Sequence, residues 1–77
     1  MGRLYHITKA LTEEQKAAIL ADVRALENVE KADITEEGFV LFTKDGEFEA
    51  VMNVAVNIFD RLGAGSEVSF ERFVYEA

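Results

Sequence analysis

Cysteine, proline and tryptophan are absent from this sequence, and histidine occurs once. The absence of cysteine excludes disulfides, thiolate zinc sites, dithiol redox motifs and cysteine nucleophiles, so packing alone must stabilise the fold. No proline-rich or low-complexity tract interrupts the chain, and its 77 residues are enough for one core only. We therefore expect a single domain over residues 1–77.

Long apolar runs are also missing. No stretch approaches the roughly 18 apolar residues of a membrane span, and the first residues, MGRLYHITK, lack the apolar segment and small-residue cleavage site of a secretion signal. We expect a cytoplasmic protein without direct membrane insertion.

Basic residues are few, since eight Lys and Arg stand against fifteen Asp and Glu and the formal net charge is −7. Proteins that bind nucleic acids usually neutralise phosphates with a basic patch. We expect no nucleic-acid partner. A basic protein, a neutral small molecule or a cation suits this acidic chain better.

Hydrophobic periodicity in the first half predicts a strand, a helix and a hairpin. Residues 3–8 form the first strand. Thr12 and Gln15 have the spacing of a capping box, which predicts a helix from 13 to about 27. A hairpin then joins strands 29–34 and 39–42 through a turn at 36–38.

The second half predicts one more helix and one more strand. Residues 44–46 close the hairpin, and a helix over 50–62 ends with Gly63 in the C′ position. The last strand covers 68–70 and 73–75, with large side chains on both parities. Asn53 and Asn57 lie four residues apart on this helix and are expected to form an outward polar edge, the alternative being a polar contact with another helix.

This element order predicts an α+β ferredoxin-like βαββαβ sandwich. Two right-handed crossovers interleave into one four-stranded antiparallel sheet of order 4-1-3-2, with both helices on one face.

The stretch from 7 to 63 resembles the heavy-metal-associated domain of copper chaperones and of the N-terminal tails of metal-pumping ATPases. The likeness lies in the layout of strand, short loop and helix, in the passage ALENVEKA at 25–32, in the turn at Gly38 and in the helix running into Gly63. The resemblance implies a metal-handling domain, such as an appendage of a cation-transport ATPase.

The family's metal site is a Cys-x-x-Cys at the start of the first helix, and Thr12 and Gln15 occupy those positions here. Neither supplies the sulfur ligands that Cu(I) selects. The sequence therefore indicates a degenerate site, and we expect no metal and no cofactor there.

A second resemblance is to the RNA-recognition motif, which has the same topology and stacks bases on aromatic residues of its central strands. The run GFVLF at 38–42 matches the end of its third-strand signature, and Tyr5 lies on the first strand. Thr35 and Glu36 replace the basic residue and glycine that open the signature, and the acidic balance disfavours RNA.

Other polar residues give weaker signals. His6 is a candidate ligand or base, but no nucleophile or orienting group accompanies it, and a structural role on the strand is the simpler interpretation. The acidic residues form no twelve-residue calcium loop, and the run from Lys44 to Glu47 has the composition of a turn.

The sheet face opposite the helices is the most informative predicted surface. Both parities of the last two strands are apolar, so large side chains should point to that open face and form a partner or homodimer interface. The alternative is that Arg72, Arg3, Lys31 or the C-terminal residues cover these side chains within the monomer. The predicted interface residues are Leu4, His6, Phe39, Leu41, Phe70, Phe73 and Tyr75.

We expect a non-catalytic interaction or regulatory module that resembles a heavy-metal-associated domain without its thiolates. The alternatives are a metal-binding module that uses His6 or carboxylates, and a small-molecule-binding regulatory domain of the same topology. No nucleophile, base and orienting group can be named together, so an enzyme is not expected.

Overall fold

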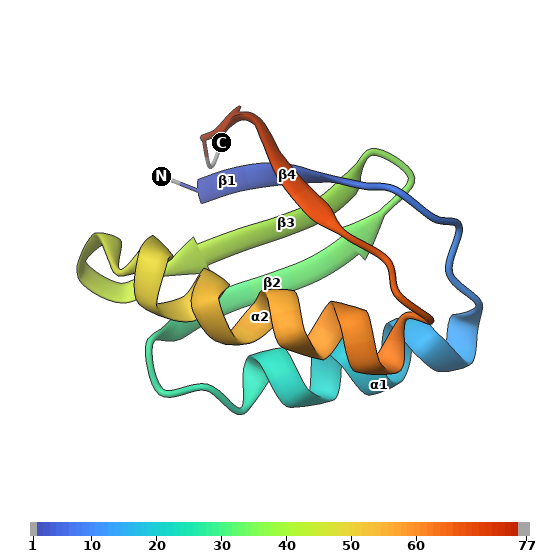
Figure 1. Cartoon of the computed structure of the whole chain (residues 1–77). Coiled ribbons are helices and arrows are strands. Elements are labelled where there is room, and N and C mark those ends of the chain that lie inside the picture. Colours follow the sequence, from blue (N-terminus) through green and yellow to red (C-terminus); the bar gives the residue numbers. More distant parts are fainter. Residues whose placement is uncertain (1, 76–77) are drawn as a thin grey trace.

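The computed structural model describes residues 2–75 and every side chain among them except that of Asp45. A single four-stranded sheet is covered on one side by two helices (Figure 1). The elements are β1 (Gly2–Ile7), α1 (Glu13–Arg24), β2 (Val29–Thr35), β3 (Gly38–Thr43), the 3₁₀ helix η1 (Lys44–Gly46), α2 (Phe48–Leu62) and β4 (Val68–Val74).

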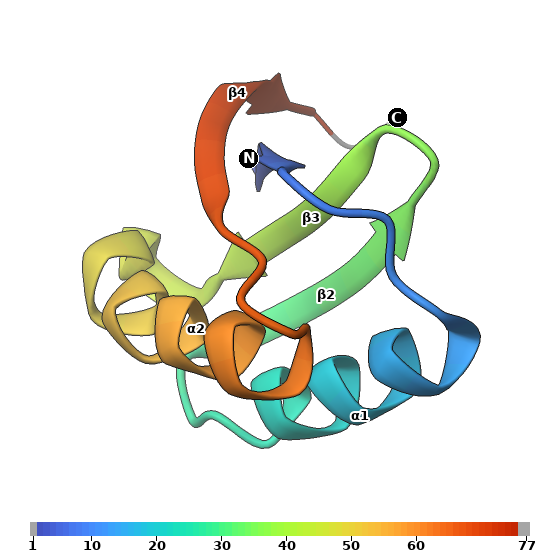
Figure 2. The same cartoon turned by 45° about the vertical axis from the view of Figure 1, so that its right-hand side comes forward.

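The strand order is β2-β3-β1-β4, and all pairs are antiparallel. This is the predicted order 4-1-3-2 read from the other edge, so the ferredoxin-like βαββαβ architecture is confirmed. β2 and β4 form the two edges, and β4 curves away from α2 toward its C-terminal end (Figure 2). Within residues 2–75, neither helix is long and apolar enough to cross a membrane.

Helix α1 begins where its capping box predicts and ends earlier than expected. The helix ends at Arg24, not near residue 27. Beyond this end, the Leu26 backbone N–H donates to the Val23 carbonyl at 3.0 Å. The Arg24 guanidinium turns toward β2 and donates to the Ala32 carbonyl through Nε at 3.0 Å and Nη2 at 2.8 Å. Helix propensity alone does not reveal this end, because residues 25–27 are good helix formers.

Helix α2 begins at Phe48, two residues before the predicted start, and ends at Leu62 as predicted. Gly63 does not take the left-handed conformation expected at C′, since its φ is −105°. Ala64 does, at φ 54°, and the Gly65 amide donates to the Asp60 carbonyl at 2.9 Å, as in a Schellman motif. A glycine is required at position 63 for a steric reason, because a Cβ there would lie 2.5 Å from the Phe59 carbonyl oxygen.

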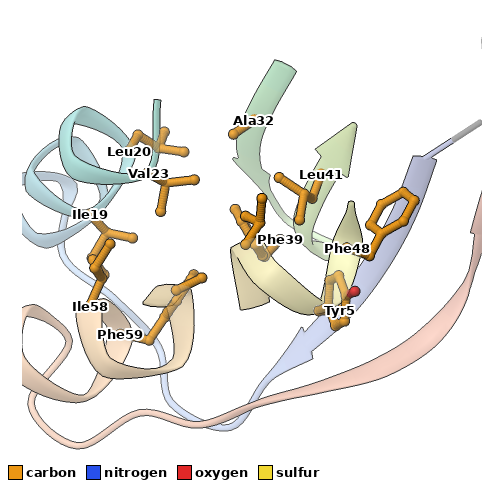
Figure 3. Close-up of a cluster of buried hydrophobic side chains, with 12 residues drawn as sticks. Tyr5, Ile19, Leu20, Val23, Ala32, Phe39, Leu41, Phe48, Ile58 and Phe59 are labelled. Atoms are coloured by element: carbon orange, nitrogen blue, oxygen red, sulfur yellow. The ribbon is translucent and has the colours of Figure 1, made fainter. Parts of the chain in front are cut away.

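The core lies between the helices and the sheet. Figure 3 shows Ile19, Leu20 and Val23 of α1 and Ile58 and Phe59 of α2 lying opposite side chains of the sheet. From the sheet, Tyr5, Ala32, Phe39 and Leu41 point into this cluster. The interpretation that Phe39 and Leu41 lie on the open face is therefore wrong, since both are fully buried against the helices.

Candidate functional site

Thr12 and Gln15, which the sequence resemblance aligns with metal ligands, are engaged in capping α1. The backbone N–H of Gln15 donates to Thr12 Oγ1 at 3.1 Å, and the backbone N–H of Thr12 donates to Gln15 Oε1 at 2.9 Å. The two side chains thus satisfy two of the backbone N–H groups at the helix start, which water or a ligand would otherwise satisfy.

His6 lies on the open face at the end of β1. It is exposed and pairs in register with Ser69 of β4. Among the described residues, no three His, Asp or Glu side chains are grouped closely enough to hold a metal ion.

Zn(II) and Cu(I) are expected to bind no more tightly than to a generic acidic surface. The physical reason is that Thr12 and Gln15 offer no thiolate and are already bonded to the helix backbone. Titration with either ion, followed by amide chemical shifts, measures this. The His6→Ala variant should titrate like the wild type, and a tight one-to-one site at residues 9–15 or at His6 would contradict the expectation.

A hollow of about 330 Å³ lies between the loop after β1 and the turn joining β2 to β3. It opens where the β1–β3 pairing stops at Tyr5 and Phe39, while the β1–β4 pairing continues to Ile7 and Val68. Two of its charged side chains are engaged by the protein itself. Lys9 Nζ donates to the Ala64 carbonyl at 2.7 Å, and Glu37 is bound by Arg72. A ligand that used Lys9 or Glu37 would therefore have to compete with these contacts.

The open face is largely closed by the side chains of the sheet itself. The Phe42 ring lies over Gly2, where a Cβ would be 2.7 Å from the ring, and Lys31 Nζ lies 5.4 Å from the centre of that ring. Leu4 is fully buried between its register neighbours Val40 and Arg72.

An ion pair completes this cover. Arg72 Nη2 donates to Glu37 Oε2 at 2.7 Å and thereby joins β4 to the turn before β3, on the far side of β1. Of the two arrangements considered from the sequence, cover by Lys31 and Arg72 within the monomer is thus the one observed on this face. Leu4 is not available to a partner, whereas His6 remains exposed.

The exposed aromatic side chains lie instead at the β4 edge, where Phe70 and Phe73 point to the side that faces the helices and Tyr75 directly follows the strand. We define the β4 surface as Phe70, Phe73 and Tyr75, whose exposed fractions are 48%, 45% and 73%. Phe70 lies against Tyr5 with ring centroids 6.1 Å apart, and against Phe73 with centroids 5.1 Å apart.

A β-bulge brings Phe70 and Phe73 together. Tyr5 pairs with Phe70 and Leu4 with Arg72, so Glu71 is an extra residue on β4. In a regular strand, residues three apart point to opposite faces. The extra residue shifts the alternation of side chains by one position, so that the Phe70 and Phe73 rings point to the same side of the sheet.

Arg3 joins this surface to α2. Its guanidinium carbon lies 4.3 Å from the centre of the Phe48 ring, 5.5 Å from that of Phe70 and 5.7 Å from that of Phe73. Its Nε is buried and has no acceptor among the described residues. Cation–π contacts with three rings thus hold a guanidinium that forms no ion pair with a described carboxylate.

The two sheet edges differ in how they are occupied. On β2 the Ala32 carbonyl accepts both hydrogen bonds from Arg24, so α1 reaches over that edge. On β4 no side chain within residues 2–75 has a corresponding hydrogen bond to the strand backbone from Val68 to Val74. Among the described residues, the β4 edge is therefore not covered in this way.

Sequence reasoning placed Phe70, Phe73 and Tyr75 among the residues of an interface on the open face, but Phe70 and Phe73 lie on the side that faces the helices. The sequence did not indicate Phe48 as part of this surface, because its pattern does not place the start of α2 beside β4. Arg3 was considered only as a side chain that covers the open face of the sheet. Asn53 and Asn57 are exposed on α2, as expected for an outward polar edge, and Asn57 Nδ2 donates to the Asn53 carbonyl at 3.3 Å.

Comparison of the chain with protein-family models, with curated proteins and with solved structures finds no match. The resemblance to heavy-metal-associated domains thus stays a prediction from the sequence.

Proposed function

We propose that this domain is a non-catalytic, cytoplasmic protein-interaction module that binds its partner through the β4 surface. The observation that carries the proposal is the contact between two exposed aromatic side chains, Phe70 and Phe73, on the edge strand β4, with the exposed Tyr75 directly after the strand. Aromatic residues and arginine are the side chains most enriched at the energetic centres of protein interfaces. Arg3 stands beside these rings.

The size of the β4 surface limits the kind of complex. From their exposed fractions, the three aromatic side chains present roughly 300 Å², taking about 200 Å² for each full side chain. A standard interface buries about 800 Å² on each partner. The aromatic side chains therefore supply less than half of such an interface, and the partner must also cover the polar residues around them or bind weakly.

Two other exposed apolar residues provide a matched control. Val54 and Val56 of α2 are exposed by 43% and 46%, similar to the two phenylalanines, but they lie on a different element. Single exposed apolar side chains are normal on protein surfaces and carry no function by themselves. Their replacement should leave binding unchanged.

The test is a selection of random peptides displayed on phage against the wild-type domain. We expect the enriched peptides to shift the amide resonances of residues 68–75, to bind V54S/V56S like the wild type and to lose at least tenfold in affinity for F70S/F73S, in the range of a hot-spot substitution of roughly 1.4 kcal/mol or more. Peptides that bind all three proteins equally, or the absence of any enrichment, would refute the proposal. The amide spectrum of F70S/F73S checks that the variant is folded.

A further inference from the structure

Arg3 lies among three aromatic rings without an acceptor for its guanidinium N–H groups. The guanidinium carbon is 4.3 Å from the centre of the Phe48 ring, and Phe70 and Phe73 flank it at 5.5 and 5.7 Å. The chain contains fifteen Asp and Glu residues, and none of those that the structure describes pairs with Arg3. The β4 surface thus adjoins a positive charge that the described part of the chain leaves uncompensated.

The rings leave the terminal nitrogens of Arg3 available to a partner. A guanidinium that lies over an aromatic ring uses its flat face, while its N–H groups lie in the plane of the group and point outward. Nε of Arg3 is buried, but the residue as a whole is only half-buried. The two terminal nitrogens are neither fully buried nor hydrogen-bonded within residues 2–75.

A carboxylate is the group that complements this arginine best. Its two oxygens match the parallel N–H groups of a guanidinium and also neutralise the charge, which a carbonyl oxygen does not. The contacts with three rings already restrict the Arg3 side chain, so little further rotamer freedom is lost when the pair forms. A partner that covers the rings also excludes water from the pair and strengthens it relative to an exposed salt bridge.

We infer that the partner of the β4 surface is a protein segment in which one Asp or Glu side chain pairs with Arg3, while an adjacent apolar side chain covers Phe70 and Phe73. This inference rests on the proposed function and specifies the chemistry of its partner. One carboxylate is expected because the net charge of −7 repels an acidic partner, and each further negative charge increases that repulsion. A side chain within a segment, unlike a chain end, also lets the partner continue past the rings on both sides.

The peptide selection gives the first test. Displayed peptides are joined to the coat protein at their C-terminus, so Asp and Glu side chains are the carboxylates that they offer. We expect the enriched peptides to share one Asp or Glu next to an aromatic or aliphatic residue. The net charge of the domain favours basic peptides in general. A consensus of Lys and Arg without an acidic residue would therefore overturn the inference.

Removal of one group on each side tests the pair itself. In the enriched peptide, replacing Asp by Asn or Glu by Gln removes the charge and keeps the shape. In the domain, Arg3→Met removes the guanidinium and keeps an unbranched apolar side chain against the rings. Each change alone should weaken binding at least about tenfold, and both together no more than about threefold beyond either one, because the same pair is lost once. Calorimetric titration measures the four affinities, and losses that multiply would overturn the pair.

Two further variants separate charge from geometry. Arg3→Lys keeps the charge without the planar pair of donors, so it should bind the acidic peptide more weakly than the wild type and more tightly than Arg3→Met. Arg61→Met is the matched control, because Arg61 is exposed near the end of α2 opposite Phe48. It should bind like the wild type. The amide forms of the peptide test the wild-type domain and remain decisive if Arg3→Met is unstable.

The outcomes distinguish this inference from the proposed function. Peptides that require Phe70 and Phe73 but bind Arg3→Met like the wild type would overturn the carboxylate pair and leave the interaction module intact. Self-association through Phe70 and Phe73 in sedimentation equilibrium, without affinity for the acidic peptides, would do the same. Failure to enrich any peptide that shifts the amide resonances of residues 68–75 would overturn both.

Discussion

Replacing Phe39 by alanine is expected to lower the free energy of unfolding by about 3–5 kcal/mol. The Phe39 side chain is fully buried, and its ring meets Tyr5 at 6.0 Å and Phe59 at 5.0 Å between centroids. Its removal leaves a cavity at the point where β3, β1 and α2 meet. Since a domain of this size is stabilised by only about 4–12 kcal/mol, a large part of the F39A population is expected to be unfolded at moderate temperature.

Urea unfolding followed by circular dichroism measures this loss. Phe73→Ala is the matched control, because it deletes the same atoms from a side chain that is already 45% exposed at the sheet edge. It should cost no more than about 1 kcal/mol. Equal losses for the two variants would show that Phe39 does not pack as the structure shows.

Replacing Gly38 by alanine is expected to destabilise the domain by more than about 3 kcal/mol, through two effects that act together. Gly38 has φ 141°, a conformation that side chains with a Cβ rarely adopt. A Cβ at this position would also collide with the Tyr5 carbonyl oxygen, which belongs to the backbone of the central strand. Relief requires β3 to move away from β1 beside the core.

Gly46→Ala separates these two effects. Gly46 also has a positive φ, 72°, but a Cβ there has no atom within 4 Å. It should therefore show the conformational cost alone, about 1–2 kcal/mol. Thermal melts of both variants measure the difference, and a Gly38→Ala variant no less stable than Gly46→Ala would be inconsistent with the close approach of β3 to β1.

The fold was predictable because its local signals agree with one another. Thr12 and Gln15 predict the start of α1 correctly, and the turn residues at 36–38 locate the hairpin. The sequence signals do not locate those helix ends that depend on tertiary contacts. Arg24 leaves the helix to bind the Ala32 carbonyl, and Phe48 begins α2 without a capping side chain before it.

For the candidate site at β4, the sequence predicts the residue types but not their arrangement. Exposed aromatic residues on the last strand follow from its sequence, but the face that they occupy does not. Alternation places Phe70 and Phe73 on opposite sides, and only the extra residue Glu71 brings them together. A bulge depends on the register between two strands that lie far apart in the sequence, and the pattern of either strand alone does not contain it.

The structure of the two sheet edges also affects the tendency of the domain to aggregate. An uninterrupted edge strand can recruit further chains without limit and so lead to fibrillar aggregates. In this domain Arg24 occupies one edge and the bulge at Glu71 distorts the other, so neither edge offers a long straight template.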